Sequence, residues 1–325
     1  MPDPSPPQSP CPDPQPDDLT SSQDPLPARL DADDFMISGR ESPPPEGLVL
    51  VSTPIGNLGD MTPRAIATLK AADLVLCEDT RVSGRLLARW DIRTRLQPMH
   101  DHNEDGRIPQ VLALLREGRR VAVISDAGMP LVSDPGYRLV RAALAEGLPV
   151  GAIPGANAAT LALVLSGLPP QPFLFLGFAP PRQAARRSAF ASLRAAERAG
   201  LSATLLYYEA PHRLAETLAD MADGFGPRPA AIARELTKRF EEIRRDTLPT
   251  LAAHYAAHAA RGEITIVIGP PPEEQSGEAD LDEMLRTALA TTTLKEAVAQ
   301  VTAATGLPRK QIYARALAIG SKTQD

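Results

Sequence analysis

Short apolar runs alternate with amphipathic stretches along the first half of the chain. The run Val121–Ile124 is typical of a strand buried on both faces. It ends in the small and polar turn Ser125–Gly128, and Asp134 with Pro135 has the pattern of a helix N-cap and a first-turn proline. A strand, a tight turn and a helix in this order predict a site at the carboxyl edge of a parallel sheet, although an ordinary strand-to-helix loop has the same pattern.

The same alternation extends over residues 47–166. Strands are predicted at 47–53, 73–77, 121–124 and 150–153. Helices are predicted at 62–71, through 86–90, around 111–115, at 137–146 and up to 166. Strands that alternate with helices of this length indicate a parallel α/β sheet.

The pattern changes after residue 168, where helices become fewer for each strand. Strands are predicted at 173–178, 203–209, 230–235, 241–246 and 262–268. Helices are predicted at 183–199, after 213, at 251–259, at 281–289, at 294–305 and at 308–318. The strand-rich part indicates a mixed sheet, and the last two helices have the spacing of a helix-turn-helix.

Composition divides the chain further. Residues 1–45 carry nine acidic and two basic residues, a net charge of −7, and 13 of the 34 prolines. Such a segment buries too little apolar surface to offset its ordering entropy, so we predict that it is disordered. The expected organisation is therefore this acidic tail, an N-terminal α/β domain at 46–168, a second α/β domain at 169–270, a linker at 271–279 and a helical extension at 280–325.

The lengths of the apolar runs, the cysteine count and the N-terminal composition exclude several classes of protein. No apolar run approaches the ~20 residues of a membrane span. Cys11 and Cys77 lie far apart without ligand spacing, so neither a disulfide framework nor a zinc site is expected. The proline-rich, acidic start does not resemble a secretory signal, and we therefore expect the cytoplasm. Without the tail, the chain is nearly neutral.

Three predicted strand ends lead into turns of small residues: Pro54–Gly56, Asp126–Gly128 and Pro154–Ala158. None of them matches the GxGxxG fingerprint or the GxxxxGK[ST] loop, which argues against a common dinucleotide or nucleoside triphosphate site. A ligand held by backbone groups here would be small and would need little phosphate neutralisation. Turn geometry alone also explains glycine and proline at such positions.

Two further clusters carry ionisable groups. Glu78, Asp79 and Arg81 follow a strand directly, where they are either functional or a solvated helix cap. The loop His100–Glu104 contains a His-x-His pattern, but no other ligand is placed near it, so we expect a surface or substrate loop and no metal.

Basic residues gather in the second domain. They lie in the stretch Arg234–Arg239 and at Arg182, Arg186, Arg187, Arg194 and Arg198. Arginines on a helix surface are often simply solvated, but their concentration in a nearly neutral body favours a polyanion such as RNA. Tyr207 and Tyr208, beside Glu209, are placed where a base could stack.

Taken together, the motifs over residues 48–320 resemble ribosomal RNA small subunit methyltransferase I. The segments that carry the resemblance are 50–58 with Asp60 and 62–65, 77–81, 102–104, 125–130 with 133–136, 153–158, 177–178 with Pro180, 208–213 and 234–238. The chain departs from the family pattern in its acidic tail and at Ala179 and Ala210, where Leu and Ser are expected.

The resemblance implies a two-domain tetrapyrrole-methylase-like α/β fold with a small C-terminal helical extension, usually as a homodimer. It implies S-adenosylmethionine between the domains and methylation of a cytidine 2′-hydroxyl in the decoding region of 16S rRNA, on the small ribosomal subunit, with no role for a membrane or DNA. The implied catalytic residues are Glu78, Asp79, Arg81, His102 and Asn103, with the base left open. The implied cofactor-binding residues are Pro54, Asp126, Ala127, Gly128, Met129, Gly155, Ala156, Asn157 and Ala158. The implied RNA-binding residues are Arg186, Arg187, Tyr208, Glu209, Arg213, Arg234 and Lys238.

Two alternatives stay open at this point. A corrin or porphyrin methylase shares the fold, but its glycine-rich first loop is replaced here by Pro54–Asn57. The second alternative is an RNA-binding assembly factor without catalytic activity, which would protect rRNA yet fail to bind S-adenosylmethionine.

Overall fold

The computed structural model describes residues 43–272, 278–305 and 308–320. The acidic tail up to residue 42, most of the proposed linker and the last five residues lie outside the described residues. Within the described part, no helix is both long enough and apolar enough to cross a membrane.

The first sheet is parallel throughout, as predicted. Its strands are β1 (Leu48–Val51), β2 (Leu74–Cys77), β3 (Leu96–Pro98), β4 (Val121–Ile124) and β5 (Val150–Ile153). Their order is β3-β2-β4-β1-β5, so the chain reverses its direction of winding around β1 and β4. The edge strand β3 was not predicted because three residues with no apolar run give no periodic signal.

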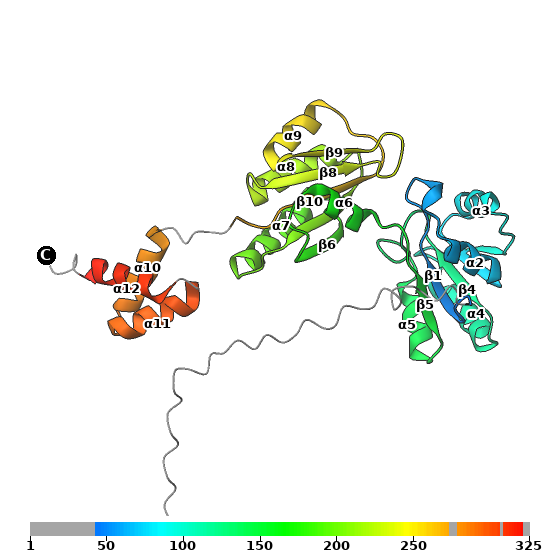
Figure 1. The fold of residues 1–325 in the computed structure, drawn as a ribbon, viewed down its shortest axis with the longest axis horizontal. Coiled ribbons are helices and arrows are strands. Elements are labelled where there is room, and N and C mark those ends of the chain that lie inside the picture. The colour runs from blue at the N-terminus through cyan, green and yellow to red at the C-terminus, as the bar shows by residue number, and fades with distance from the viewer. Residues whose placement is uncertain (1–42, 273–277, 306–307, 321–325) are drawn as a thin grey trace, which may run out of the picture. The chain divides into compact units, whose positions relative to one another are not determined.

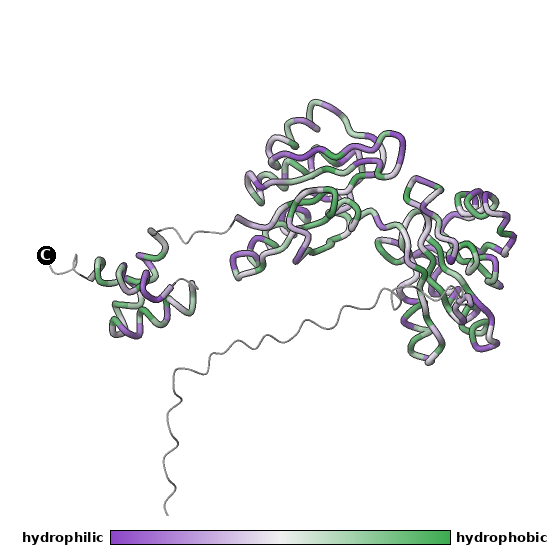
Figure 2. Tube along the Cα trace, in the orientation of Figure 1, coloured by the Kyte–Doolittle hydropathy of each residue, from purple (hydrophilic) through white to green (hydrophobic). Residues whose placement is uncertain are grey.

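Helices cover both faces of this sheet (Figure 1). They are α2 (Pro63–Ala71), α3 (Thr80–Arg89), α4 (Glu104–Arg116) and α5 (Tyr137–Ala145). Residues of α2 and α3 pack against one set of alternating strand residues, and residues of α4 and α5 pack against the other set. Burial on both faces explains why the strands read as continuous apolar runs, which appear green in Figure 2.

The second sheet is mixed, also as predicted. Its strands are β6 (Phe173–Phe178), β7 (Thr204–Glu209), β8 (Pro229–Arg234), β9 (Glu242–Thr247) and β10 (Ile264–Ile268), in the order β6-β7-β10-β8-β9. Only the β6–β7 pair is parallel. Helices α7 (Gln183–Arg198), α8 (Leu214–Phe225) and α9 (Leu248–Ala257) share a core on one of its faces.

The opposite face of the second sheet is covered by α6 (Ala158–Ser166). Ala159, Ala162 and Leu163 pack there against residues of β7, β8 and β10, together with Ile55 from the first half of the chain. Although α6 follows β5 in sequence, it buries its apolar face on the second sheet, and the domain boundary at 168 stays a prediction.

Three C-terminal helices form a small core of their own. They are α10 (Glu278–Leu289), α11 (Leu294–Thr305) and α12 (Arg309–Gly320). Leu285, Val298 and Ile312 lie at its centre and are almost fully buried.

The helix α5 begins at residue 137 as predicted, but its predicted N-cap is wrong. Its N-cap is Gly136, with a φ of +121°, and not Asp134. The buried carboxylate of Glu104 caps this helix from outside, because its Oε1 accepts the N–H of Leu139 at 3.0 Å and its Oε2 accepts from Arg138 at 3.2 Å. Asp134 is thereby free for another role.

The placement of Arg186 contradicts its prediction as an RNA contact. Its side chain is fully buried and bonds to the carboxylate of Asp220, with Nε–Oδ2 at 2.7 Å. Asp220 also accepts from the half-exposed Arg187 at 2.7 Å. Arg186 is thus part of the packing of α7 against α8, with no surface left for RNA.

We predict that Asp220→Ala costs about 3–5 kcal/mol of unfolding free energy, because it leaves the Arg186 guanidinium buried without its carboxylate. Arg187→Ala is the matched control, and because its guanidinium is half-exposed, its loss should cost less than about 1 kcal/mol. Urea denaturation of both variants measures the difference. Equal losses of unfolding free energy in the two variants would contradict the assignment of Arg186 to the buried packing of α7 against α8.

Candidate functional site

Three turns meet at the carboxyl edge of the first sheet. The turns after β1 and β4 are joined by a reciprocal pair of backbone hydrogen bonds between Thr53 and Gly128, at 2.9 and 3.1 Å. Gly128 has a φ of +87°, and a Cβ placed there would lie 3.1 Å from Ile55 Cγ2 and 3.5 Å from the carbonyl oxygen of Ala156. The positive φ favours glycine here, and a Cβ would also require Ile55 to shift slightly, so the glycine has a conformational and a packing reason.

Side chains brace the same turns. Thr53 Oγ1 donates to the carbonyl of Ser125 at 3.1 Å, and Ser125 Oγ donates to the carbonyl of Gly128 at 3.0 Å. Ser52 lies so close to the third turn that a Cβ on Gly155 would sit 2.7 Å from Ser52 Cβ. These contacts hold the backbone around residues 126–129 in one position before any ligand arrives.

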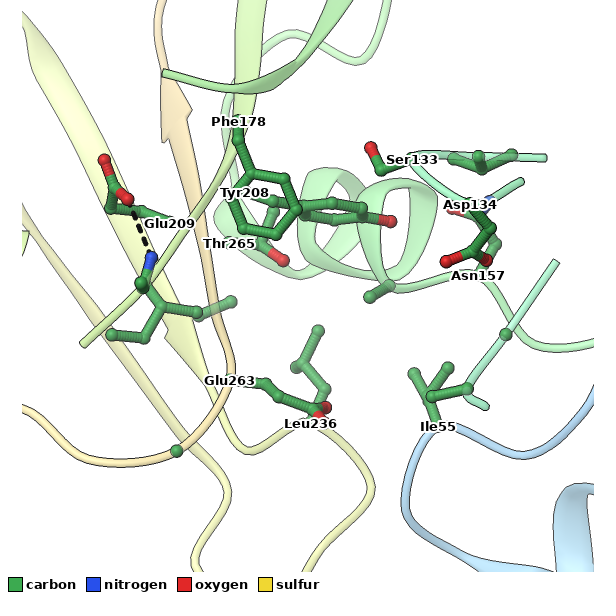
Figure 3. A pocket seen from close by; sticks show the side chains of 18 of the residues that line it. Ile55, Ser133, Asp134, Asn157, Phe178, Tyr208, Glu209, Leu236, Glu263 and Thr265 are labelled. Carbon is green, nitrogen blue, oxygen red and sulfur yellow. Dashed lines mark hydrogen bonds between the residues drawn. The ribbon is translucent and has the colours of Figure 1, made fainter. Parts of the chain in front are cut away.

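A cavity of about 390 Å³ opens beside these turns and is lined by elements of both sheets (Figure 3). This volume falls within the range of roughly 300–1,000 Å³ that small-molecule sites occupy. Of the predicted cofactor-binding residues, Asp126–Met129, Asn157 and Ala158 line it. Pro54, Gly155 and Ala156 do not line it; they shape the turns behind it, and Asn157 also caps α6 through its side chain.

The charged groups that line the cavity are all acidic. They are Asp126, Asp134, Glu209 and Glu263, and no Arg, Lys or His is among the described lining residues. The carboxylate of Glu209 is occupied inside the fold by Arg213, by Thr217 at 2.7 Å and by the N–H of Ala210 at 2.7 Å. Such a cavity suits a ligand with positive charge and disfavours one that carries phosphates or several carboxylates.

Three carboxylates at this edge disfavour ionisation in one another. Burial, together with the charges of Glu78 and Asp126, raises the pKa of Asp134 to about 6. Burial, reinforced by Asp126 and Asp101, raises the pKa of Glu78, and burial with the charge of Asp79 raises that of Asp126. Clustered carboxyl groups with raised pKa values are typical of functional sites, and a bound cation would stabilise their charged forms.

Aromatic side chains form another wall of the cavity. Tyr208 packs edge-to-face against Phe175 and Phe178, with ring centroids 4.9 and 5.7 Å apart. Its hydroxyl points toward Asp134 and Asn157 in Figure 3. Tyr208 thus lines the cavity, at a place where a planar ligand group could stack, and its contact with RNA stays a prediction.

Backbone strain is concentrated in two loops at the cavity. Leu131 and Ser133 have φ values of +71° and +70°, and Glu235 and Thr237 have values of +52° and +65°. Non-glycine residues in this region cost on the order of 1 kcal/mol each and cluster at functional sites. Ser133 and Leu236 line the cavity, so both loops take part in its wall.

The predicted catalytic cluster lies next to the cavity and does not line it. Asp79 caps α3, pairs with Arg81 at 2.6 Å and donates its backbone N–H to Asp126 at 3.4 Å. The hydrogen bonds from Arg81 hold the pKa of Asp79 well below its usual range. Glu78 is an exposed residue whose carboxylate is only partly withdrawn from water, and its pKa is shifted in the opposite direction, so the two neighbouring acids differ in their capacity to accept a proton.

The loop at 100–104 has a mainly structural character. Asn103 accepts the N–H of His100 at 2.9 Å and donates to the carbonyl of Pro98 at 3.3 Å. Glu104 caps α5, as described above. His102 is exposed on the same loop, with its ring centroid 6.1 Å from that of His100. No group of three or more His, Cys, Asp or Glu side chains within the described residues could hold a metal ion.

The other cations predicted to bind RNA are engaged in ion pairs of the second domain. Arg213 pairs with Glu209, Arg234 pairs with Glu242 at 2.9 Å, and Lys238 pairs with Glu235 and Glu263 at 2.9 and 3.0 Å. Lys238 also packs on Gly56, where a Cβ would lie 2.3 Å from its Cγ. These side chains stabilise the second domain and its contact with the first turn.

Sequence reasoning did not single out several residues that line the cavity, among them Ile55, Asp134, Phe178 and Glu263. Ile55, Phe178 and Glu263 gave no pattern that separates a lining residue from a core or surface residue. The position of Asp134, an acid two residues before a glycine, was compatible with a site residue. The pair Asp134–Pro135 also has the pattern of a helix N-cap, which was the preferred interpretation.

Comparison with known proteins is consistent with this geometry. The sequence model of the Tetrapyrrole (Corrin/Porphyrin) Methylases matches residues 47–252, and that of the RsmI C-terminal HTH domain matches residues 275–320. A solved structure of the methyltransferase CobJ superposes with a TM-score of 0.52 over 70% of this chain and 95% of that one, at 22% identity, which supports the fold alone.

Two curated relatives are much more similar in sequence. Ribosomal RNA small subunit methyltransferase I of Mesorhizobium japonicum is 47% identical over 83% of this chain and 91% of that protein. The protein of the same name from Micromonospora olivasterospora is 46% identical over 82% of this chain and 85% of that protein. The chain therefore belongs to the tetrapyrrole methylases and, within them, to the ribosomal RNA small subunit methyltransferase I family.

The raised pKa of Asp134 predicts a pH-dependent effect of Asp134→Asn on stability. The folded state disfavours the charged form of Asp134. The carboxyl group therefore does not lower the unfolding free energy below about pH 4, and it lowers the unfolding free energy fully above about pH 6. Removing the charge should therefore raise the unfolding free energy at pH 8 relative to pH 4, by on the order of 1 kcal/mol after solvent screening.

Urea denaturation at the two pH values measures this difference. Asp60→Asn, which removes an exposed carboxylate from the first sheet's domain, is measured in parallel as the matched control. A pH-independent effect of Asp134→Asn would contradict the proposed electrostatic origin.

Proposed function

We propose that the chain methylates the 2′-hydroxyl of a cytidine in 16S rRNA and uses S-adenosylmethionine as the methyl donor. The observation that carries the proposal is the acid-lined cavity at the meeting point of three turns, in a chain that belongs to the ribosomal RNA small subunit methyltransferase I family. We also propose, from the same family membership, that it works as a homodimer.

The cavity suits this cofactor in three respects. S-adenosylmethionine carries a sulfonium and an ammonium group, and Asp126 and Asp134 supply negative charge on the cavity wall. Its adenine is planar, and Phe178 and Tyr208 offer aromatic surface. It has no phosphate, which agrees with turns that lack a phosphate-binding fingerprint. When bound, it supplies an electrophilic methyl group.

The protein's task is to position the ribose and to remove its proton. Rigid turns lower the entropic cost of alignment, because residues 126–129 are already held by Thr53 and Ser125. A ribose hydroxyl is a poor nucleophile while protonated, so a general base is useful. Among the predicted candidates, we assign this role to Glu78, since its raised pKa makes it a better proton acceptor than Asp79.

The remaining candidates have supporting roles in this proposal. Asp79 and Arg81 fix the start of α3 beside the target, and Asn103 with Glu104 holds the loop that carries His102. His102 contacts the RNA from this exposed loop.

A corrin or porphyrin methylase fits the site less well. Biosynthetic tetrapyrroles carry several carboxylates, which Glu78, Asp126 and Asp134 would repel. The turn Pro54–Asn57 also packs against Lys238 and leaves no glycine-rich loop at that position.

We predict that Glu78→Gln lowers the rate of methyl transfer roughly 10²- to 10⁴-fold, because a general base is lost, while the affinity for S-adenosylmethionine stays unchanged. Asp79→Asn is the matched control and should lower the rate less than about 10-fold, through the helix cap alone. Single-turnover rates between pH 5 and 9 separate the two cases. If Glu78→Gln keeps the wild-type rate and pH profile, Glu78 is not the base.

The function itself is tested by incubating the purified chain with S-adenosylmethionine and small ribosomal subunits from a strain that lacks this gene. Mapping of ribose methylation should then show one newly methylated cytidine in 16S rRNA. Methylation of a base, or of added uroporphyrinogen instead of the RNA, would contradict the proposal. Protection of rRNA without any methyl transfer would support the inactive assembly factor.

A further inference from the structure

The outer face of α3 carries a row of arginines. Ser83 and Leu87 are buried on the inner face of this helix, and Arg81, Arg85 and Arg89 are exposed on the opposite face. Residues four apart lie above one another on a helix, so the three side chains form one row that rises by roughly 6 Å per step.

Two of these arginines have no acidic partner. Arg81 pairs with Asp79, whereas neither Arg85 nor Arg89 forms an ion pair with any part of the chain that the structure describes. This distinguishes them from Arg187, Arg234 and Lys238 of the second domain, whose charges are satisfied by neighbouring carboxylates. Unpaired guanidinium groups are available to bind an external anion.

The row begins at the proposed catalytic edge. α3 follows Glu78 directly, and its N-cap Asp79 is hydrogen-bonded to Asp126 of the cavity wall. A shallow hollow lined by Asp79, Arg81, Val82 and Arg85 lies on the helix at this end. The arginine row therefore leads from the site outward along the first domain.

The arginine row can offset an unfavourable charge interaction between the site and the RNA. An RNA strand must bring its phosphates close to Glu78, Asp126 and Asp134, which repel them. Cations that flank the target nucleotide offset this repulsion, and guanidinium groups bind phosphate in a bidentate manner.

We propose that Arg85 and Arg89 bind backbone phosphates of the RNA strand next to the target nucleotide. The proposal rests on the RNA substrate given under the proposed function. It moves the main phosphate-binding surface from the second domain, where the sequence had placed it, to α3 of the first domain.

The test compares two double variants with equal loss of charge. Arg85→Ala with Arg89→Ala should weaken binding to unmethylated small subunits roughly 10- to 100-fold and lower the slope of log K against log salt by about 1.5–2. Arg182→Ala with Arg198→Ala, which removes two exposed arginines at the ends of α7, should change binding less than about 3-fold. Both variants should bind S-adenosylmethionine as the wild type does.

The inference is overturned if the α3 variant binds within 3-fold of wild type with an unchanged salt slope, or if the α7 variant loses as much affinity. The wild type is assayed for methyl transfer in the same preparation. Absence of transfer by the wild type would refute the proposed function, whereas normal transfer together with unaltered binding by the α3 variant would refute the arginine inference alone.

Discussion

The close approach of three turns at Gly128 is the constraint on which the rest of the site depends. Reciprocal hydrogen bonds to Thr53 fix the turn after β4, and the absence of a Cβ lets Ile55 and Ala156 close upon it. This packing determines where Asp126 faces and how the strained loop beyond it reaches Ser133 and Asp134. The turn that carries Asp126 to the cavity wall is therefore held by the packing around one glycine.

The same acids have opposite electrostatic effects on the two ligands. A cluster of carboxylates suits a cationic methyl donor but repels a phosphate-bearing substrate. The second-domain arginines that were proposed from the sequence for RNA binding do not supply the missing cations, because each is bound to a carboxylate within the domain, as Arg186 is to Asp220. Positive charge is instead exposed on α3, beside the acids and outside the cavity. The separation of a negative pocket from a positive approach surface explains how one edge of the first sheet could serve both ligands.

Much of the fold could be predicted from sequence, because its signals are local. Buried runs such as Val121–Ile124 identified the parallel strands, and the changed ratio of helices to strands identified the mixed sheet. The sequence-based expectations and the structure differ where long-range packing decides. The sequence order assigned α6 to the first domain, although its apolar face is buried on the second sheet. Asp134 followed the rule for a helix cap, but Glu104 from another helix took that role and left Asp134 in the cavity. Arg186 was interpreted as a surface cation because its partner Asp220 lies 34 residues away, too far for a local sequence pattern to reveal the pair.

The most direct test of the account is calorimetric titration of S-adenosylmethionine into the full chain and two glycine variants. Gly128 and Gly118 both have positive φ values, of +87° and +76°, but a Cβ on Gly118 would meet open space. Gly128→Ala should therefore weaken binding at least 10-fold, whereas Gly118→Ala should leave the dissociation constant within about 2-fold of wild type. Unaltered binding by a folded Gly128→Ala variant, or no binding by the wild type, would contradict the claim that the three turns form the cofactor site.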